Sequence, residues 1–83
     1  MKHRDVWTPG AESALPAIWL ASRRRNAVTL AANRLDQQLA DDPFAMSESR
    51  ISGVRIAFEP PLAILFEVVA ETATARVLAV WAY

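Results

Sequence analysis

The segment SGVRIAFEPPLAILFEVVAE, residues 52–71, constrains the fold more than any other part of the chain. Its two apolar runs are separated by Pro60-Pro61, which predicts two strands joined at a position where no sheet hydrogen bond is lost. The second strand, Leu62–Val69, is apolar on both faces, so each face needs a cover. The chain has 83 residues, enough for one domain over 1–83 and little more. The sequence therefore raises the question of what covers the second face.

Two helices are predicted before these strands. Thr8-Pro9 is typical of an N-cap followed by proline at the first helical position. Pro16 falls inside the apolar stripe of this helix, so the helix is predicted either to kink near Glu12 or to begin again at Pro16. Arg23-Arg24-Arg25 closes the first helix, and Asn26 is expected to cap the second. The second helix ends at Asp42-Pro43, and its predicted inner stripe is Val28, Ala32, Leu35 and Leu39.

One more strand is predicted at each end of the chain. HRDVW is short, whereas the last strand alternates at Val77, Ala79 and Trp81. Residues 46–49 are expected to be a polar link. The predicted class is α+β: an N-terminal strand and a two-helix hairpin packed on one face of a three- to four-stranded antiparallel sheet. The second helix is expected on the Ile56/Phe58 and Ile64/Phe66 side.

Charge and composition narrow the class of protein. The net charge is +0 and no broad basic field is present, which argues against a protein that grips nucleic acid by its phosphates. The chain has no cysteine, and it shows no apolar signal segment or run long enough to span a membrane. We therefore expect a soluble cytoplasmic protein without a metal or cofactor.

Several short motifs occur in a family-like order. They are W-T-P-x-A-x-x-x-L-x-x-I-W, R-N-A-V-T-x-A-A-x-x-x-D-x-x-L-x-x-D-P, E-S-R, G-V-R-I, P-L-x-I-x-F-E-V and a closing R-V-L-A-V-W. Together they resemble the RelE/ParE superfamily of type II toxin-antitoxin toxins, of the plasmid stabilisation type. The resemblance runs from Trp7 to Trp81 and implies a compact toxin fold and a cognate antitoxin partner.

The same resemblance implies one of two activities: RelE-like members cut mRNA on the ribosome, and ParE-like members poison DNA gyrase. Arg55 stands where the nucleases carry a basic strand residue. Ala57 and Ala63 stand where further basic residues would be expected, and no basic tail follows Tyr83. The resemblance therefore favours a ParE-like toxin that binds its target and is not an enzyme. The alternatives are a RelE-like mRNA endonuclease and a degenerate interaction module.

The candidate catalytic residues are few. Arg50 and Arg55 could position a phosphate, although a surface pairing with Glu48 or Glu67 is the simpler interpretation. His3 could act as a base, but it lies near the chain terminus. Three further features have ordinary structural explanations: Asp41-Asp42 as a helix-ending turn, the arginine run as a solvated turn, and Trp7, Trp19 and Trp81 as core residues.

The face of the central strand that points away from the helices is the candidate partner site. An apolar face without a cover commonly marks a protein interface, so we expect an antitoxin helix or strand to cover it. A homodimer, or the link at residues 46–49, could cover it instead. The predicted binding residues are Ala57, Ala63, Leu65, Leu78 and Val80, with Arg55 and Glu67 at the rim.

Overall fold

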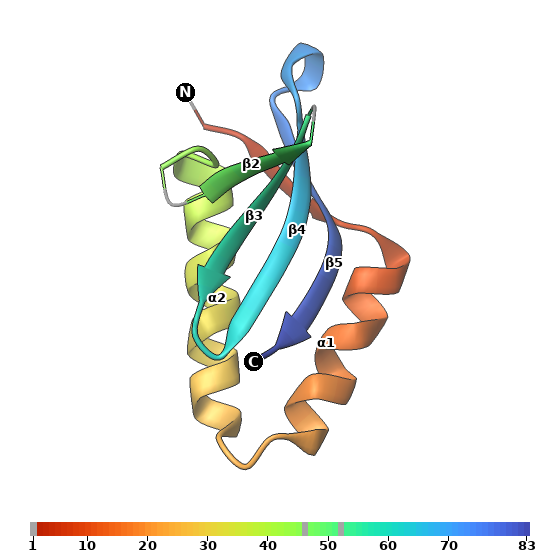
Figure 1. The fold of residues 1–83 in the computed structure, drawn as a ribbon, viewed down its shortest axis with the longest axis vertical. Coiled ribbons are helices and arrows are strands. Elements are labelled where there is room, and N and C mark those ends of the chain that lie inside the picture. Colours follow the sequence, from red (N-terminus) through yellow and green to blue (C-terminus); the bar gives the residue numbers. More distant parts are fainter. Residues whose placement is uncertain (1, 46, 52) are drawn as a thin grey trace.

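The computed structural model describes residues 2–45, 47–51 and 53–83. Its five strands form one sheet in the order β1-β5-β4-β3-β2, and only the β1–β5 pair is parallel. In Figure 1 the strands lie in front of the two helices. The elements are β1 Arg4–Trp7, α1 Pro9–Ala21, α2 Arg25–Asp41, β2 Ser47–Ile51, β3 Val54–Glu59, β4 Leu62–Val69, a 3₁₀ turn Ala70–Thr72, and β5 Thr74–Ala82.

The first helix begins as predicted. The Thr8 hydroxyl accepts a hydrogen bond from the Ala11 amide at 3.4 Å, and Pro9 occupies the first turn. Pro16 lies inside a single continuous helix, so the predicted restart at this residue does not occur. The chain thus keeps α1 as one element despite the hydrogen bond that this proline removes.

The hairpin turn differs from the prediction. Arg24, not Asn26, is the N-cap of α2, and it makes no side-chain capping bond. The Arg25 guanidinium donates to the carbonyl oxygens of Trp19 and Leu20 at 3.2 and 3.1 Å. A cation at the end of α1 is favourable for the helix dipole, and these contacts agree with the prediction that the arginine run closes the first helix.

The core lies between the helices and one face of the sheet. Leu35 in α2 and Phe66 in β4 are both 0% exposed. The α2 stripe was predicted correctly except that Ala31 is buried where Ala32 is only half-buried. The other buried members of this core are Ala11, Val28, Leu39, Ala57, Leu62, Ile64, Ala75, Val77 and Val80.

The sheet has one strand more than the upper limit predicted. Ser47–Ile51 pairs with β3 as the edge strand β2, although its polar sequence was interpreted as a link; Met46 lies outside the described residues. The sheet is also mixed rather than purely antiparallel, because β1 runs parallel to β5. No helix in the described part of the chain has both the length and the hydropathy required to cross a membrane.

The predicted facing of β3 is wrong. Ala57 pairs with Ile64, and Ile64 with Val80, all on the helix side. Ala57 and Val80 are therefore core residues rather than members of the opposite face. Ile56 and Phe58 point away from the helices instead, because successive side chains of a strand alternate between faces.

Polar contacts on the helix side stabilise this orientation of β3. Arg55 and Glu59 share the helix side with Ala57, and both find contacts there. The Arg55 Nε donates to the Ser47 hydroxyl at 2.7 Å, and Glu59 lies 3.4 Å from Arg34 of α2. The two charged residues are thus satisfied beside the core, where a sequence pattern alone would place them in solvent.

Leu78 is the extra residue of a bulge in β5. Phe66 pairs with Val77, but the neighbouring Leu65 pairs with Ala79. The bulge leaves Leu78 without a partner on β4 and keeps Ala79 beside Leu65. Leu78 therefore does not belong to the regular rows of either sheet face.

Candidate functional site

The outer sheet face, defined here as the face turned away from α1 and α2, carries a row of three side chains. Phe58, Ala63 and Trp81 are cross-strand neighbours. Ala63 is 0% exposed, whereas Phe58 and Trp81 are 42% and 38% exposed. The two aromatic rings flank the small alanine. Side chains of β3 and β5 therefore cover this part of the second face of β4.

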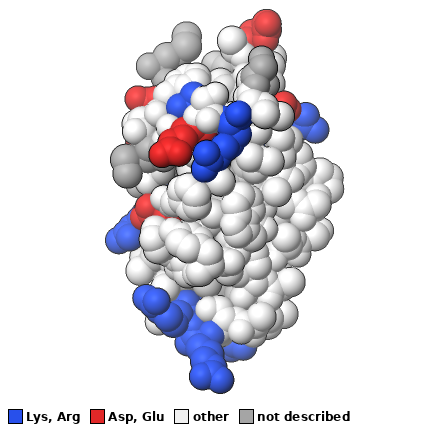
Figure 2. Space-filling view, viewed as in Figure 1, with Lys and Arg blue, Asp and Glu red and all other residues white. Residues whose placement is uncertain are grey.

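Tyr83 extends this aromatic row. Its ring meets Phe58 edge-on, with centroids 5.7 Å apart, and its backbone amide donates to the Pro61 carbonyl at 3.0 Å. Tyr83 itself is 62% exposed. Figure 2, viewed onto this face, shows a broad area without charged atoms across the middle of the molecule. The outer sheet face thus presents an uncharged, partly aromatic surface to solvent.

A second row on the same face contains Ile56, Leu65 and Ala79. Ile56 is buried and Leu65 is half-buried. Next to it, the Glu67 carboxylate accepts from the Arg76 guanidinium at 2.8 Å. Glu67 therefore lies at the rim of the outer sheet face as predicted, but its partner is Arg76 and not Arg55.

Arg50 and Arg55 do not converge on one site. Arg50 lies 3.8 Å from Glu48, and Glu48 is opposite Ile56 of the outer sheet face. Arg55 is opposite Phe66, on the helix side, and its guanidinium also donates to the Ser47 carbonyl at 2.9 Å. The prediction that Arg55 borders the outer sheet face is therefore wrong, whereas the Arg50–Glu48 pairing is confirmed.

Phe44 connects His3 with Arg55. The Arg55 guanidinium lies over the Phe44 ring at 5.0 Å, and His3 meets the same ring edge-on at 6.4 Å. The His3 amide also donates to the Ala40 carbonyl, which holds this segment against the end of α2. No sequence motif indicated this grouping, because its three members come from distant segments.

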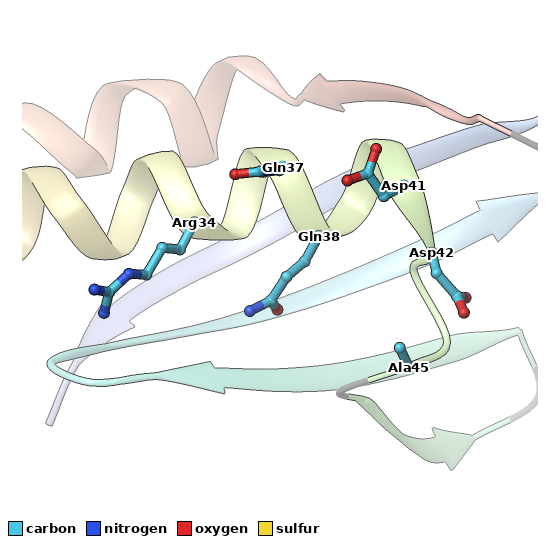
Figure 3. A pocket seen from close by; sticks show the side chains of 6 residues that line it. All are labelled: Arg34, Gln37, Gln38, Asp41, Asp42 and Ala45. Carbon is cyan, nitrogen blue, oxygen red and sulfur yellow. The ribbon is translucent and has the colours of Figure 1, made fainter.

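The end of α2 carries a hollow of about 300 Å³ that is lined mostly by residues with polar side chains. Figure 3 shows Arg34, Gln37, Gln38 and Asp41 along α2, with Asp42 and Ala45 in the segment that follows. Asp41 is 3.8 Å from Lys2, and the Asp42 carboxylate accepts from the Phe44 amide at 3.1 Å. These contacts confirm a helix-ending turn. Within the described residues, no group of three potential metal ligands forms.

A carboxyl pair joins β1 to α2. The Asp5 carboxyl lies beside that of Asp36, whose Oδ1 accepts a hydrogen bond from the Trp7 indole N–H at 2.8 Å. Burial, followed by the hydrogen bond and the charge of Asp36, raises the pKa of Asp5 from 3.8 to about 6. The folded chain therefore binds this proton more tightly than the unfolded chain does.

This pair gives a prediction for stability against pH. The contribution of the Asp5 proton is fully present below pH 3.8 and is lost as the pH rises through about 6. Asp5→Asn, which stays neutral, should raise the free energy of unfolding near neutral pH by about 1 kcal/mol, a discounted value because Asp5 is only half-buried. Near pH 3.8, the pKa of Asp5 in the unfolded chain, this gain should vanish. Urea unfolding at neutral pH and near pH 3.8 measures the gain.

The exposed Asp41→Asn variant is the control. An equal gain for Asp5→Asn at the two pH values would contradict the pairing of Asp5 with Asp36.

No protein-family model matches the chain, and no curated protein matches its sequence. Solved structures do match its fold. A chain of the toxin-antitoxin complex RelBE2 from Mycobacterium tuberculosis superposes with a TM-score of 0.80 and 16% identity, over 100% of this chain and 93% of that one. A chain of the chromosomal ParDE toxin-antitoxin system from P. aeruginosa gives 0.71 and 19%, over 98% and 96%. The chain therefore has the fold that its resemblance to the RelE/ParE toxins predicted.

Proposed function

We propose that this protein is the toxin of a type II toxin-antitoxin pair and that it acts in a ParE-like way, by binding a macromolecule such as DNA gyrase. The main support is the match in fold to chains of the RelBE2 and ParDE complexes over nearly the whole length. Fold alone does not define an activity. The choice between binding and cleavage therefore rests on the side chains.

The arrangement of the arginines favours binding. Cleavage of RNA without a metal needs groups that transfer protons and a cluster of cations that stabilises the charge of the transition state. Arg50 lies beside Glu48 and Arg55 donates to Ser47, so each arginine already contacts a different protein group. Ala57 and Ala63 are both buried, so a long cationic side chain at either position would displace the residues packed around it.

A ribosome-dependent mRNA nuclease is the second candidate. The observation in its favour is the contact of both His3 and Arg55 with the ring of Phe44. This grouping brings an imidazole, whose ring nitrogens can donate and accept protons, close to a guanidinium. Phe44 is 50% exposed and could stack on a base.

The antitoxin is proposed to cover the outer sheet face. Leu65 is the centre of its apolar rows, Ala63 is the small residue between two aromatic rings, and Glu67 with Arg76 forms a charged rim. An amphipathic helix from the antitoxin could place its apolar side chains along these rows. A second copy of the chain is the alternative occupant of this face.

Controlled expression in a bacterial host tests the proposed activity. Growth arrest with filamentation and a DNA-damage response is expected, together with relief when the cognate antitoxin is co-expressed. The purified protein is expected not to cut ribosome-bound mRNA. A ladder of cleavage products positioned by codon, lost in Arg55→Ala, would establish the nuclease instead. Normal growth at full expression would contradict both activities and leave an interaction module.

A further inference from the structure

A groove of about 490 Å³ runs between α1 and α2, apart from the outer sheet face. Leu15, Val28 and Ala32 contribute apolar atoms to it, and Trp19 forms part of its wall. The Trp19 indole donates to the Thr29 hydroxyl at 3.1 Å, which links the two helices near their turn. The groove therefore has a largely apolar lining and is long in the direction of the helices.

The two ends of this groove carry opposite charges. Glu12 and Asp36 line the end near the start of α1. At the other end, the Arg25 guanidinium lies 4.8 Å from the centre of the Trp19 ring. Arg23 and Arg24 are exposed in the same turn, and blue atoms gather at the bottom of Figure 2, where Figure 1 shows that turn. A ligand in the groove would thus meet negative charge first and positive charge about 10 Å further along.

We propose that this groove binds an amphipathic α-helix of a partner protein, in one direction, with the N-terminus of the helix at Glu12 and Asp36. A helix carries partial positive charge at its N-terminus and partial negative charge at its C-terminus. In this direction both ends are complementary to the groove, and in the reverse direction both are repelled. Apolar side chains spaced i, i+3, i+4 and i+7 would lie along Leu15, Val28 and Ala32.

Two stapled peptides test this direction on the full chain. Each has about 12 residues, enough to cover the groove, with leucines at the same spacing and the same composition. One carries lysines in its first turn and glutamates in its last; the other has these charges exchanged. Circular dichroism verifies that the staple keeps both helical. The first peptide is expected to bind about tenfold more tightly and to shift the indole N–H resonance of Trp19, which Trp19→Phe identifies.

Matched variants separate the groove from general charge effects. Glu12→Gln should weaken the first peptide about two- to fivefold, whereas Glu71→Gln, the same change at an exposed site in the 3₁₀ turn, should leave it unchanged. Equal affinity for both peptides, no binding of either, or resonance shifts confined to the outer sheet face would each overturn the proposal. These binding measurements do not depend on growth inhibition, so failure of the groove proposal can be distinguished from failure of the proposed toxin function.

Discussion

Replacing Leu35 with alanine is expected to lower the free energy of unfolding by about 2–5 kcal/mol. Leu35 is 0% exposed and packs between α2 and the sheet. Its truncation removes apolar contacts and leaves a cavity that the neighbouring helix and strands can fill only in part. Because a small domain has a stability of only about 5–15 kcal/mol, the melting temperature should fall by roughly 10 °C or more.

Leu30→Ala is the matched control for this change. It removes the same atoms from the same helix, but Leu30 is 55% exposed, so the loss of stability should be about 0.5 kcal/mol or less. Chemical denaturation of the three proteins gives both values. Similar losses for the two variants would mean that α2 does not pack on the sheet through the Leu35 face.

Leu65→Asp is expected to weaken antitoxin binding about 100-fold or more, if the antitoxin covers the outer sheet face. The new carboxylate would be buried under the partner without a cation to pair with, and such a charge is costly to desolvate. The unbound chain should remain folded, because Leu65 is only half-buried. Titration of the purified antitoxin against both proteins measures the loss.

Leu30→Asp serves as the comparison for Leu65→Asp, since it places the same charge on an exposed leucine of α2. It should leave the affinity unchanged. Circular dichroism shows whether each variant is folded. Unchanged binding by a folded Leu65→Asp protein would place the antitoxin on another surface, and an unfolded monomer would identify Leu65 as a core residue. Loss of self-association instead would favour a homodimer.

The central part of the fold could be predicted because its signals are local. Leu62–Val69 is a strand with the bounds that the double proline and the apolar run indicated. Thr8-Pro9 likewise marks the start of α1. These signals depend on backbone geometry within a few residues, and distant contacts do not alter them.

The facing of the strands could not be predicted in the same way. In β3 the alternation defines two faces but does not say which one packs on the helices. The large Ile56 and Phe58 look like the core side, yet the small Ala57 lies beneath α2. This choice depends on Ser47 and Arg34, which accommodate Arg55 and Glu59 from other elements. In β5 the bulge at Leu78 shifts the pairing, which explains why Val80 was assigned to the wrong face.

The parallel pairing of β1 with β5 has a consequence for how the chain folds during translation. Arg4–Trp7 is made first, but its partner strand, Thr74–Ala82, is separated from it by both helices and three strands. The N-terminal strand must therefore wait, with its backbone groups unpaired, until nearly all the remaining elements have been synthesised. Such non-local pairing slows folding, so we expect β1 to join the sheet only after β5 has been synthesised.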